Sequence, residues 1–290
     1  MTSPAAMTWP DGFTSAASFT FDVDAESAVL WGQPQNANRM SVISHQAYGP
    51  LVGVPRILAM LGRHGIRSTF FVPGYTALRY PHVVRDIAAA GHELAHHGFL
   101  HEQPTALTPA EQADALDRGL DALEAVAGVR PVGYRAPMWD LSWEMPALLH
   151  ERGFLYDSSL MDGDAPYELR VAPDASASIV ELPIEWTLDD WEQYCYLPDI
   201  SGSGLIETPA KARELWTSAF RGLHAANGCW ILTNHPFLSG RPGRAAELDL
   251  LMAEVTSTPG VWVAPLAEIA QHARGLGLPP RSIERPDALG

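Results

Sequence analysis

Two aspartates and a histidine-rich segment have residue types and a spacing suited to chemistry. Asp22 and Asp24 stand two residues apart at the end of an apolar stretch, residues 17–23. Side chains alternate along a strand, so residues at this spacing project to the same side. A single aspartate there is more often a cap or turn residue, but two adjacent carboxylates are costly without a cation. The pair therefore predicts a cation site.

The segment GHELAHHGFLHE, residues 91–102, supplies further candidate ligands. His97 and His101 are four residues apart, which on one helical turn brings both imidazoles to one point. Among 11 histidines such a pair also arises by chance. Together with one aspartate it gives three protein ligands and leaves a fourth position for water, as in a catalytic metal site. We interpret His96 and Glu102 as supporting or capping groups.

Two further residues are candidates because of their position. Arg135, in YRAPMW, follows one apolar stretch, and His235, in TNHPF, follows the apolar stretch CWILT. Each residue alone is more often structural. Their common place after predicted strands makes them candidates, because active-site residues of parallel α/β folds gather at the carboxyl ends of the strands.

The elements that must position these residues alternate between strand and helix. We expect strands at residues 17–23, 68–73, 93–95, 133–135, 154–157, 179–183, 229–233 and 261–265. We expect helices at residues 54–64, 81–90, 109–126, 143–152, 210–226 and 245–255, and a long loop from residue 25 to about residue 53. This alternation predicts an α/β fold with a parallel sheet and outer helices, either a barrel or a doubly wound sheet.

Composition narrows the class of protein. The 290 residues have no internal repeat or linker, which predicts one domain over residues 1–290, with a core of about 15–273 and a mobile or docking tail at 275–290. The 34 acidic residues exceed the 19 basic ones. Because the sequence has no basic run, we expect no nucleic-acid binding. Cys195 and Cys229 form no CxxC pair. Without a signal peptide or an apolar run near membrane length, we expect a cytoplasmic protein with no membrane segment.

Five segments in order, FDVD, HHGFLHE, RAPMW, WTLDDW and TNHP, resemble the polysaccharide deacetylase family, also called the NodB-homology or carbohydrate esterase family 4 domain. The resemblance covers about Ser15 to Ala273. It implies a distorted (β/α) barrel with fewer than eight full repeats, and one zinc or similar divalent ion. By that resemblance the metal ligands are Asp24, His97 and His101.

The resemblance also implies the remaining roles. Asp22 is the expected general base, Arg135 its partner, and His235 the general acid. The acid that orients this histidine falls on Asp189, with Asp190 close behind. A backbone N–H such as that of Met138 is the expected donor to the developing oxyanion.

Two departures indicate a branch within this family. Val23 separates the two aspartates that the family writes as neighbours, and the aromatic of the third motif is displaced, giving Met138 then Trp139. Both features look like the branch that contains the Helicobacter-type peptidoglycan deacetylase, cyclic imidases and metal-independent allantoinase-like proteins. Members of that branch tend to form homotetramers, so we expect a homo-oligomer.

These residues predict hydrolysis of a non-peptide C–N bond, with no organic cofactor because no phosphate loop or GxSxG elbow is present. We favour a small soluble amide or N-acetyl substrate, with the predicted loop after the first strand as a lid. The alternatives are ring opening of a cyclic imide, N-deacetylation of peptidoglycan or chitooligosaccharides, and a non-catalytic binding protein. The expected substrate-binding residues are Met138 and four tryptophans, of which some belong to the core: Trp31, Trp139, Trp186 and Trp191.

Overall fold

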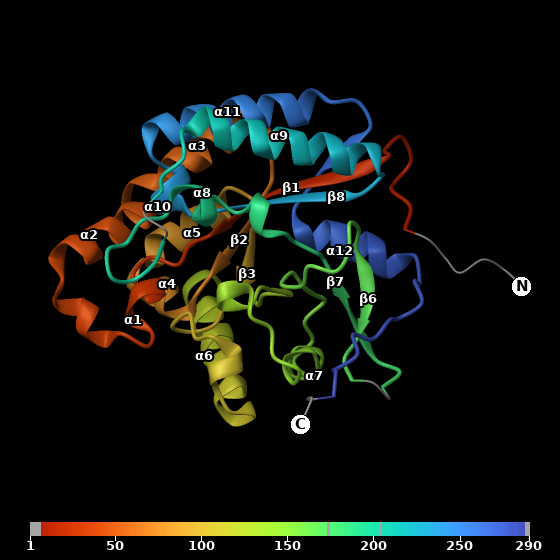
Figure 1. The fold of residues 1–290 in the computed structure, drawn as a ribbon. Helices are drawn as coiled ribbons and strands as arrows, with labels where there is room; N and C mark the ends of the chain where they lie inside the picture. Colours follow the sequence, from red (N-terminus) through yellow and green to blue (C-terminus); the bar gives the residue numbers. More distant parts are fainter. Residues whose placement is uncertain (1–6, 173–174, 203–204, 288–290) are drawn as a thin grey trace, which may run out of the picture.

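A curled, mostly parallel sheet forms a half-barrel with helices outside it (Figure 1). The computed structural model describes residues 7–172, 175–202 and 205–287. The strand order is β6-β7-β5-β4-β3-β2-β1-β8, and β9 pairs with β1. The strands are β1 Ser15–Asp22, β2 Thr69–Val72, β3 Glu93–His96, β4 Gly133–Tyr134, β5 Tyr156–Asp157, β6 Tyr167–Arg170, β7 Ser178–Glu181, β8 Cys229–Asn234 and β9 Val261–Val263.

Strand β1 lies at the centre of the fold. It pairs in parallel with β8 along most of its length, with β2 at its carboxyl end and with β9 at its amino end. All eight of its residues are buried. A parallel strand covered on both faces carries mostly small and apolar side chains, and Asp22, the one charged residue of β1, closes the strand at its carboxyl end.

Among the three clusters of buried apolar side chains, two lie on opposite sides of the central strands, because successive strand residues face opposite sides. Phe70 and Trp230 pack outward against the helices, whereas their chain neighbours Phe71 and Ile231 pack inward. Helix α12 (Leu266–Gly275) contributes its apolar face to the cluster on the inner side. The two sides of the sheet are therefore filled independently, and the carboxyl end remains available for polar side chains.

The six predicted helices are present, and others were not predicted. Helix α6 begins at a capping box in which the Thr108 hydroxyl and the Glu111 carboxylate satisfy each other's backbone N–H. Helices α9 and α11 lie side by side over β1 and β8 (Figure 1). The predicted helices are α3 Val54–His64, α5 Pro81–Ala89, α6 Pro109–Ala127, α7 Met145–Glu151, α9 Pro209–Ala225 and α11 Pro242–Ser257; the additional ones are α4 Gly74–Arg79, α8 Asp190–Tyr194, α10 Pro236–Ser239 and α12 Leu266–Gly275.

The prediction of a long loop after β1 is wrong. That stretch holds α1 (Ser27–Leu30), the 3₁₀ helix η1 (Pro34–Asn38), α2 (Met40–Tyr48) and the π-helix η2 (Gly49–Gly53), which runs into α3. The glycine and proline content of this stretch is typical of a loop, but Gly53 is required for close packing. A Cβ at this position would overlap the carbonyl oxygen of Pro236 in α10.

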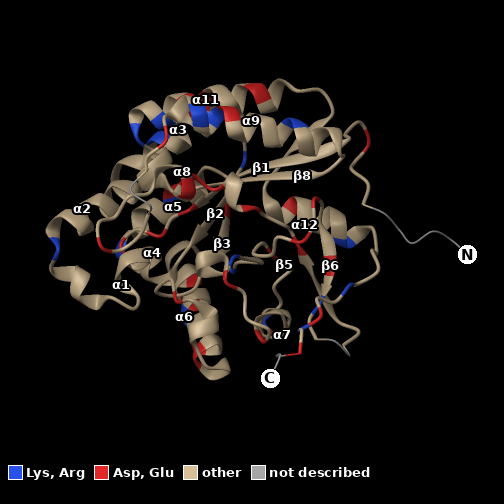
Figure 2. Cartoon of the chain, viewed as in Figure 1, with Lys and Arg blue, Asp and Glu red and all other residues tan. Residues whose placement is uncertain are grey.

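The other departures are at the sheet edge and the C-terminal end. Strand β6 was not predicted and pairs with β7 antiparallel. The N–H of Arg281 donates to the carbonyl of Glu168, and the carbonyl of Arg281 accepts from Arg170, so this part of the predicted tail docks along β6. The tail's last three residues lie outside the described part. In the described ranges, no helix is long and apolar enough to span a bilayer. Basic residues are spread over several helices (Figure 2).

Candidate active site

The polar residues predicted from separate segments meet at one edge of the sheet. Asp22 ends β1 and Asp24 follows it, His97 follows β3, Arg135 follows β4, and His235 follows β8. All five side chains are buried. The carboxyl ends of neighbouring parallel strands open on the same side, which brings these distant residues together.

His97 and His101 meet, but on a loop. Strand β3 ends at His96, and the chain then turns back through two residues in the left-handed region, Gly98 with φ 73° and His101 with φ 60°. The two imidazole rings have centroids 5.0 Å apart. Glu102 accepts the N–H of Phe99 and closes this turn. The predicted helical turn is therefore wrong, because a glycine and a strained histidine bend the chain more tightly.

Asp24, His97 and His101 each direct one ligand atom to a common point, with these atoms within 4.8 Å of one another. Nε2 of His97 lies 3.4 Å from Oδ1 of Asp24, and Nε2 of His101 lies 3.6 Å from Oδ2. Nδ1 of His97 is 2.8 Å from the carbonyl oxygen of Arg135, to which it donates, so Nε2 carries the lone pair.

The donor set fits a divalent cation. Both carboxylate oxygens of Asp24 are buried, and no described group donates a hydrogen bond to either. Burial lowers the pKa of His97 well below its ordinary value and lowers the pKa of His101 to about 4. Both imidazoles are thus neutral near neutral pH, which is the form that binds metal. An orphaned carboxylate between two neutral imidazoles is the arrangement that a cation completes.

Asp22 is held by a buried guanidinium. Nη1 of Arg135 donates to Oδ1 of Asp22 at 2.9 Å and to the hydroxyl of Thr20 at 3.0 Å. Nε and Nη2 of Arg135 donate to the carbonyl and hydroxyl of Ser158, and the guanidinium lies 4.1 Å from the ring centroid of Phe71. Burial raises the pKa of Asp22 to about 6, against the opposing effect of Arg135. Such a carboxyl is suited to take up a proton near neutral pH.

His235 faces the same point from the other side. Its Nε2 lies 3.5 Å from Oδ2 of Asp24, and its Nδ1 lies 2.8 Å from Oδ1 of Asp190. Burial opposes a charge on His235, but Asp189 and Asp190 outweigh this and raise its pKa well above its ordinary value. The imidazole is therefore held in its protonated form, which is able to donate from Nε2.

The two aspartates beside His235 differ in what they contact. Asp190 accepts Nδ1 and the backbone N–H of His235, and also the N–H of Ser239. Asp189 Oδ1 stands farther from Nδ1, at 3.4 Å, and accepts the N–H of Trp191, which caps α8. His235 thus donates its Nδ1 hydrogen bond to Asp190, whereas the sequence favoured Asp189 as the acceptor.

The expected substrate-binding residues line one pocket of about 310 Å³ over these groups. The rings of Trp139 and Trp186 stack with centroids 4.5 Å apart. Met138 and Trp139 both have positive φ, and the Met138 side chain is half-exposed at the pocket. Trp31 and Trp191 complete the aromatic walls.

Several polar residues that line the pocket were not predicted from the sequence. They lie in segments read as loop, where no periodicity marks a side chain as facing a site. These residues are Gln33, Gln103, Glu192 and Ser201.

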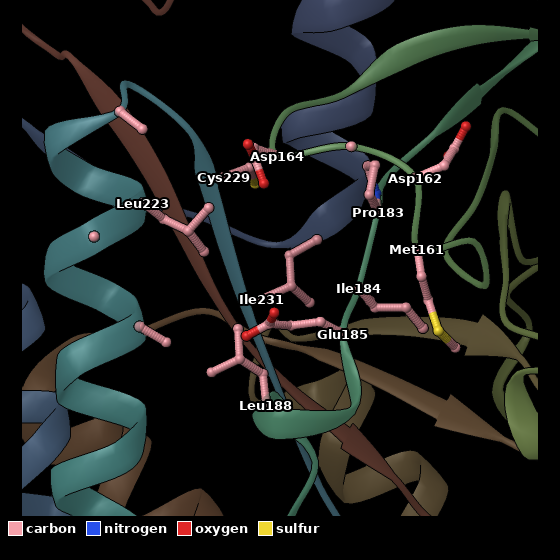
Figure 3. Close-up of a pocket in the computed structure, with 14 residues that line it drawn as sticks. Met161, Asp162, Asp164, Pro183, Ile184, Glu185, Leu188, Leu223, Cys229 and Ile231 are labelled. Carbon is pink, nitrogen blue, oxygen red and sulfur yellow. The ribbon is translucent and has the colours of Figure 1, made fainter.

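A larger cavity, of about 530 Å³, lies outside this site. It is bounded by α9, by Cys229 and Ile231 of β8, and by the segment after β7, and the Glu185 side chain points into it (Figure 3). Its lining carries acidic and apolar side chains but no histidine. The smaller pocket is therefore the candidate active site.

The chain is similar to proteins of one known family. The family model described as polysaccharide deacetylase matches residues 47–156. The peptidoglycan deacetylase of Helicobacter pylori is 27% identical over 274 residues, covering 86% of this chain and 94% of that protein. A peptidoglycan deacetylase-like protein of Gibberella zeae is 31% identical over 225 residues, covering 70% of this chain and 67% of that one.

A solved structure is more similar still. The putative polysaccharide deacetylase of Mycobacterium smegmatis is 57% identical, has a TM-score of 0.95, and is matched over 99% of both chains. These similarities indicate a hydrolase that acts on carbon–nitrogen bonds other than peptide bonds. The chain belongs to the polysaccharide deacetylase family.

Proposed function

We propose that this protein is a metal-dependent amidohydrolase that cleaves a small amide or N-acetyl compound. The observation that carries the proposal is the convergence of three buried candidate ligands, Asp24, His97 and His101, beside the Asp22–Arg135 and His235–Asp190 pairs. A non-catalytic binding protein would not need a base, an acid and a cation site next to one another.

Asp24, His97 and His101 would hold zinc or another single divalent ion. When bound, this ion supplies Lewis acidity, which polarises a carbonyl and lowers the pKa of a water molecule. A role as ligands accounts for the two carboxylate oxygens of Asp24 that no described donor contacts.

The chain's own residues then move protons. Asp22 takes a proton from the attacking water, and Arg135 fixes the orientation of that carboxylate. The backbone N–H of Met138, in its left-handed turn, donates to the oxygen of the former carbonyl. His235 donates from Nε2 to the leaving nitrogen, while Asp190 holds its Nδ1. Cleavage thus releases an acid and an amine.

Pocket dimensions support a small substrate. A volume of about 310 Å³ is near the lower end for ligand sites and suits a small compound better than an extended polysaccharide. Trp31 and Gln33 come from the helical segment after β1, which forms one wall of the pocket. Ring opening of a cyclic imide uses the same attack on an amide carbonyl and is equally compatible with this site.

A second candidate function is N-deacetylation of peptidoglycan or of chitooligosaccharides. The similarity to the Helicobacter pylori peptidoglycan deacetylase favours it, and the tryptophan walls offer faces on which a sugar ring stacks.

A cytoplasmic location and a homotetramer stay predictions. Two buried free cysteines support the first of these.

The test compares turnover of small amides, cyclic imides and N-acetylated oligosaccharides at matched concentration, with Asp22→Asn as the inactive control. We expect faster turnover of the small compounds. Hydrolysis that rises with oligosaccharide length would overturn the small-substrate proposal and establish the polymer reaction instead.

A further inference from the structure

A second pair of carboxylates is buried behind the site. Asp157 ends β5 and Glu181 ends β7, and the two residues are register partners in the sheet. Both side chains are fully buried. Neither belongs to the set that faces the pocket, so the proposed mechanism leaves this pair unexplained.

The donors around this pair satisfy only one oxygen of each carboxyl group. Oδ1 of Asp157 accepts the hydroxyl of Ser159 at 2.7 Å, and Oε1 of Glu181 accepts the N–H groups of Ser159 at 3.2 Å and Leu160 at 3.0 Å. Oδ2 of Asp157 and Oε2 of Glu181 are buried, and no donor in the described part of the chain contacts them.

One proton between the two groups resolves this arrangement. Two adjacent, buried carboxylates without a cation cannot both be ionised at low cost. If one carboxyl is protonated, it donates to the other, and both orphaned oxygens are satisfied. Burial raises the pKa of Asp157 to about 6 and raises the pKa of Glu181 well above its ordinary value, so the proton is retained near neutral pH.

The charged and titratable groups that face the pair leave this proton in place. Arg135 is the cation on this side, and its hydrogen bonds go to Asp22, Thr20 and Ser158 instead of the pair. The phenols of Tyr134 and Tyr167 also face the pair, and burial raises the pKa of each, so both stay neutral.

The pair is connected to the site through two serines. Ser159, bonded to both carboxyl groups, accepts the N–H of Ala136 at 2.8 Å. Ala136 immediately precedes the left-handed turn that carries Met138. Ser158, between the two anchored residues, contacts Arg135 through its carbonyl at 3.1 Å and through its hydroxyl at 3.2 Å.

We propose that Asp157 and Glu181 share one proton and act as positioning residues, which fix Ser158 and Ser159 and thereby hold Arg135, the base Asp22 and the Met138 turn. This inference rests on the proposed function, because it assigns Asp22 as the base. It adds two residues that touch neither substrate nor metal. Their effect should appear in kcat, because they orient groups whose contacts are made in the transition state.

The experiment compares two substitutions at one position in the metal-loaded enzyme. Glu181→Gln keeps an oxygen for the Ser159 and Leu160 N–H groups and supplies an N–H to Asp157, so it copies the protonated form. Glu181→Leu removes both functions. We expect Glu181→Gln to keep kcat within about threefold, and Glu181→Leu to lower kcat by about tenfold to a hundredfold, the scale of a small misplacement.

Controls separate positioning from general damage. KM and metal content should change little in both variants. Glu168→Leu on β6 removes another buried acid, one bonded to Ser178 and paired with Arg274, and should cost stability while kcat stays near wild type. Asp22→Asn in the same assay tests the proposed function by itself, because its loss of activity does not depend on the pair.

Two outcomes would overturn the positioning role. One is a folded Glu181→Leu protein with wild-type kcat, and the other is equal loss in the Gln and Leu variants. If Glu181→Leu does not fold, Ser159→Ala decides, because it removes the hydroxyl that joins Asp157 to the N–H of Ala136 and leaves the backbone N–H of Ser159 to donate to Glu181. A kcat lowered about threefold to tenfold supports the proposal, and an unchanged kcat overturns it.

Discussion

Two carboxylate pairs lie at the carboxyl ends of the strands, and both are buried. In the first pair Asp22 contacts Arg135, and Asp24 faces the imidazoles of His97 and His101. In the second pair Asp157 and Glu181 contact only hydroxyl and N–H groups, and one oxygen of each is orphaned. Burial is thus common to both pairs, and their neighbours differ.

The pKa values alone do not separate the two pairs. Burial raises the pKa of Asp22, Asp24 and Asp157 alike to about 6. The identity of the neighbours assigns the chemistry. Imidazole lone pairs around an orphaned carboxylate select a metal ion, whereas two facing carboxyl groups select a proton.

Removal of the metal should have the largest effect on the first pair. Chelation, or the substitution Asp24→Asn, should lower activity by roughly a thousandfold or more, because several kcal/mol of transition-state stabilisation is lost. Metal analysis should find about one equivalent in the wild type and after re-addition. Asp157→Asn is the matched control and should keep its metal. Full activity in a verified metal-free sample contradicts the prediction.

Loss of the base should be nearly as severe but should leave the metal in place. We expect Asp22→Asn to lower kcat by about a hundredfold to ten-thousandfold, the range for general acid–base groups. The same range applies to His235→Ala. Metal content is measured in parallel. An emptied site in Asp22→Asn together with a filled one in Asp24→Asn would mean that the two aspartates have the opposite roles.

The acid beside His235 gives a smaller and more selective effect. Asp190→Asn should lower kcat by about a hundredfold, since it removes the charge that keeps Nδ1 protonated. Asp189→Asn should lower kcat less and should leave the cap of α8 largely intact, because the asparagine side-chain oxygen accepts the N–H of Trp191 in the same way. Kinetics and thermal unfolding of both variants check this order. A greater loss of kcat in Asp189→Asn would restore the assignment made from sequence.

The sequence predicted well which polar residues follow the strands, but it predicted poorly how the backbone is folded between the strands. Asp22, Arg135 and His235 follow buried strands, and parallel pairing alone brings such residues together. The candidate metal ligands His97 and His101 were paired for the wrong local reason, because a left-handed turn at Gly98 replaces the expected helical turn. Local spacing identified the pair of residues but not the backbone that joins them.

Other features depended on contacts that spacing does not encode. Asp189 and Asp190 are consecutive, and only the fold decides which of them reaches His235. The helical segment after β1 has the glycine and proline content of a loop, and it is stabilised by close packing against α10. Asp157 and Glu181 lie 24 positions apart in the chain, so their contact follows from sheet register alone.

The smallest expected effect is on the pH dependence of the free energy of unfolding, and it comes from the second pair, Asp157 and Glu181. The pKa of Glu181 is raised well above its ordinary 4.5, and that of Asp157 is raised from 3.8 to about 6. The folded protein therefore binds more protons than the unfolded chain above pH 4. The stability contributed by the shared proton is fully present below the ordinary pKa values and is lost as pH rises through the folded values.

Glu181→Gln should remove this dependence, because its amide cannot lose the shared proton. Denaturant unfolding of the metal-loaded proteins from pH 5 to 8 should show wild type losing on the order of 1–3 kcal/mol relative to the variant. Asp22 and Asp24 are common to both proteins, so their titration cancels in the difference. Asp157→Asn should flatten the curve in the same way. Parallel curves for wild type and both variants would mean that no proton is shared and would remove the contrast between the two pairs.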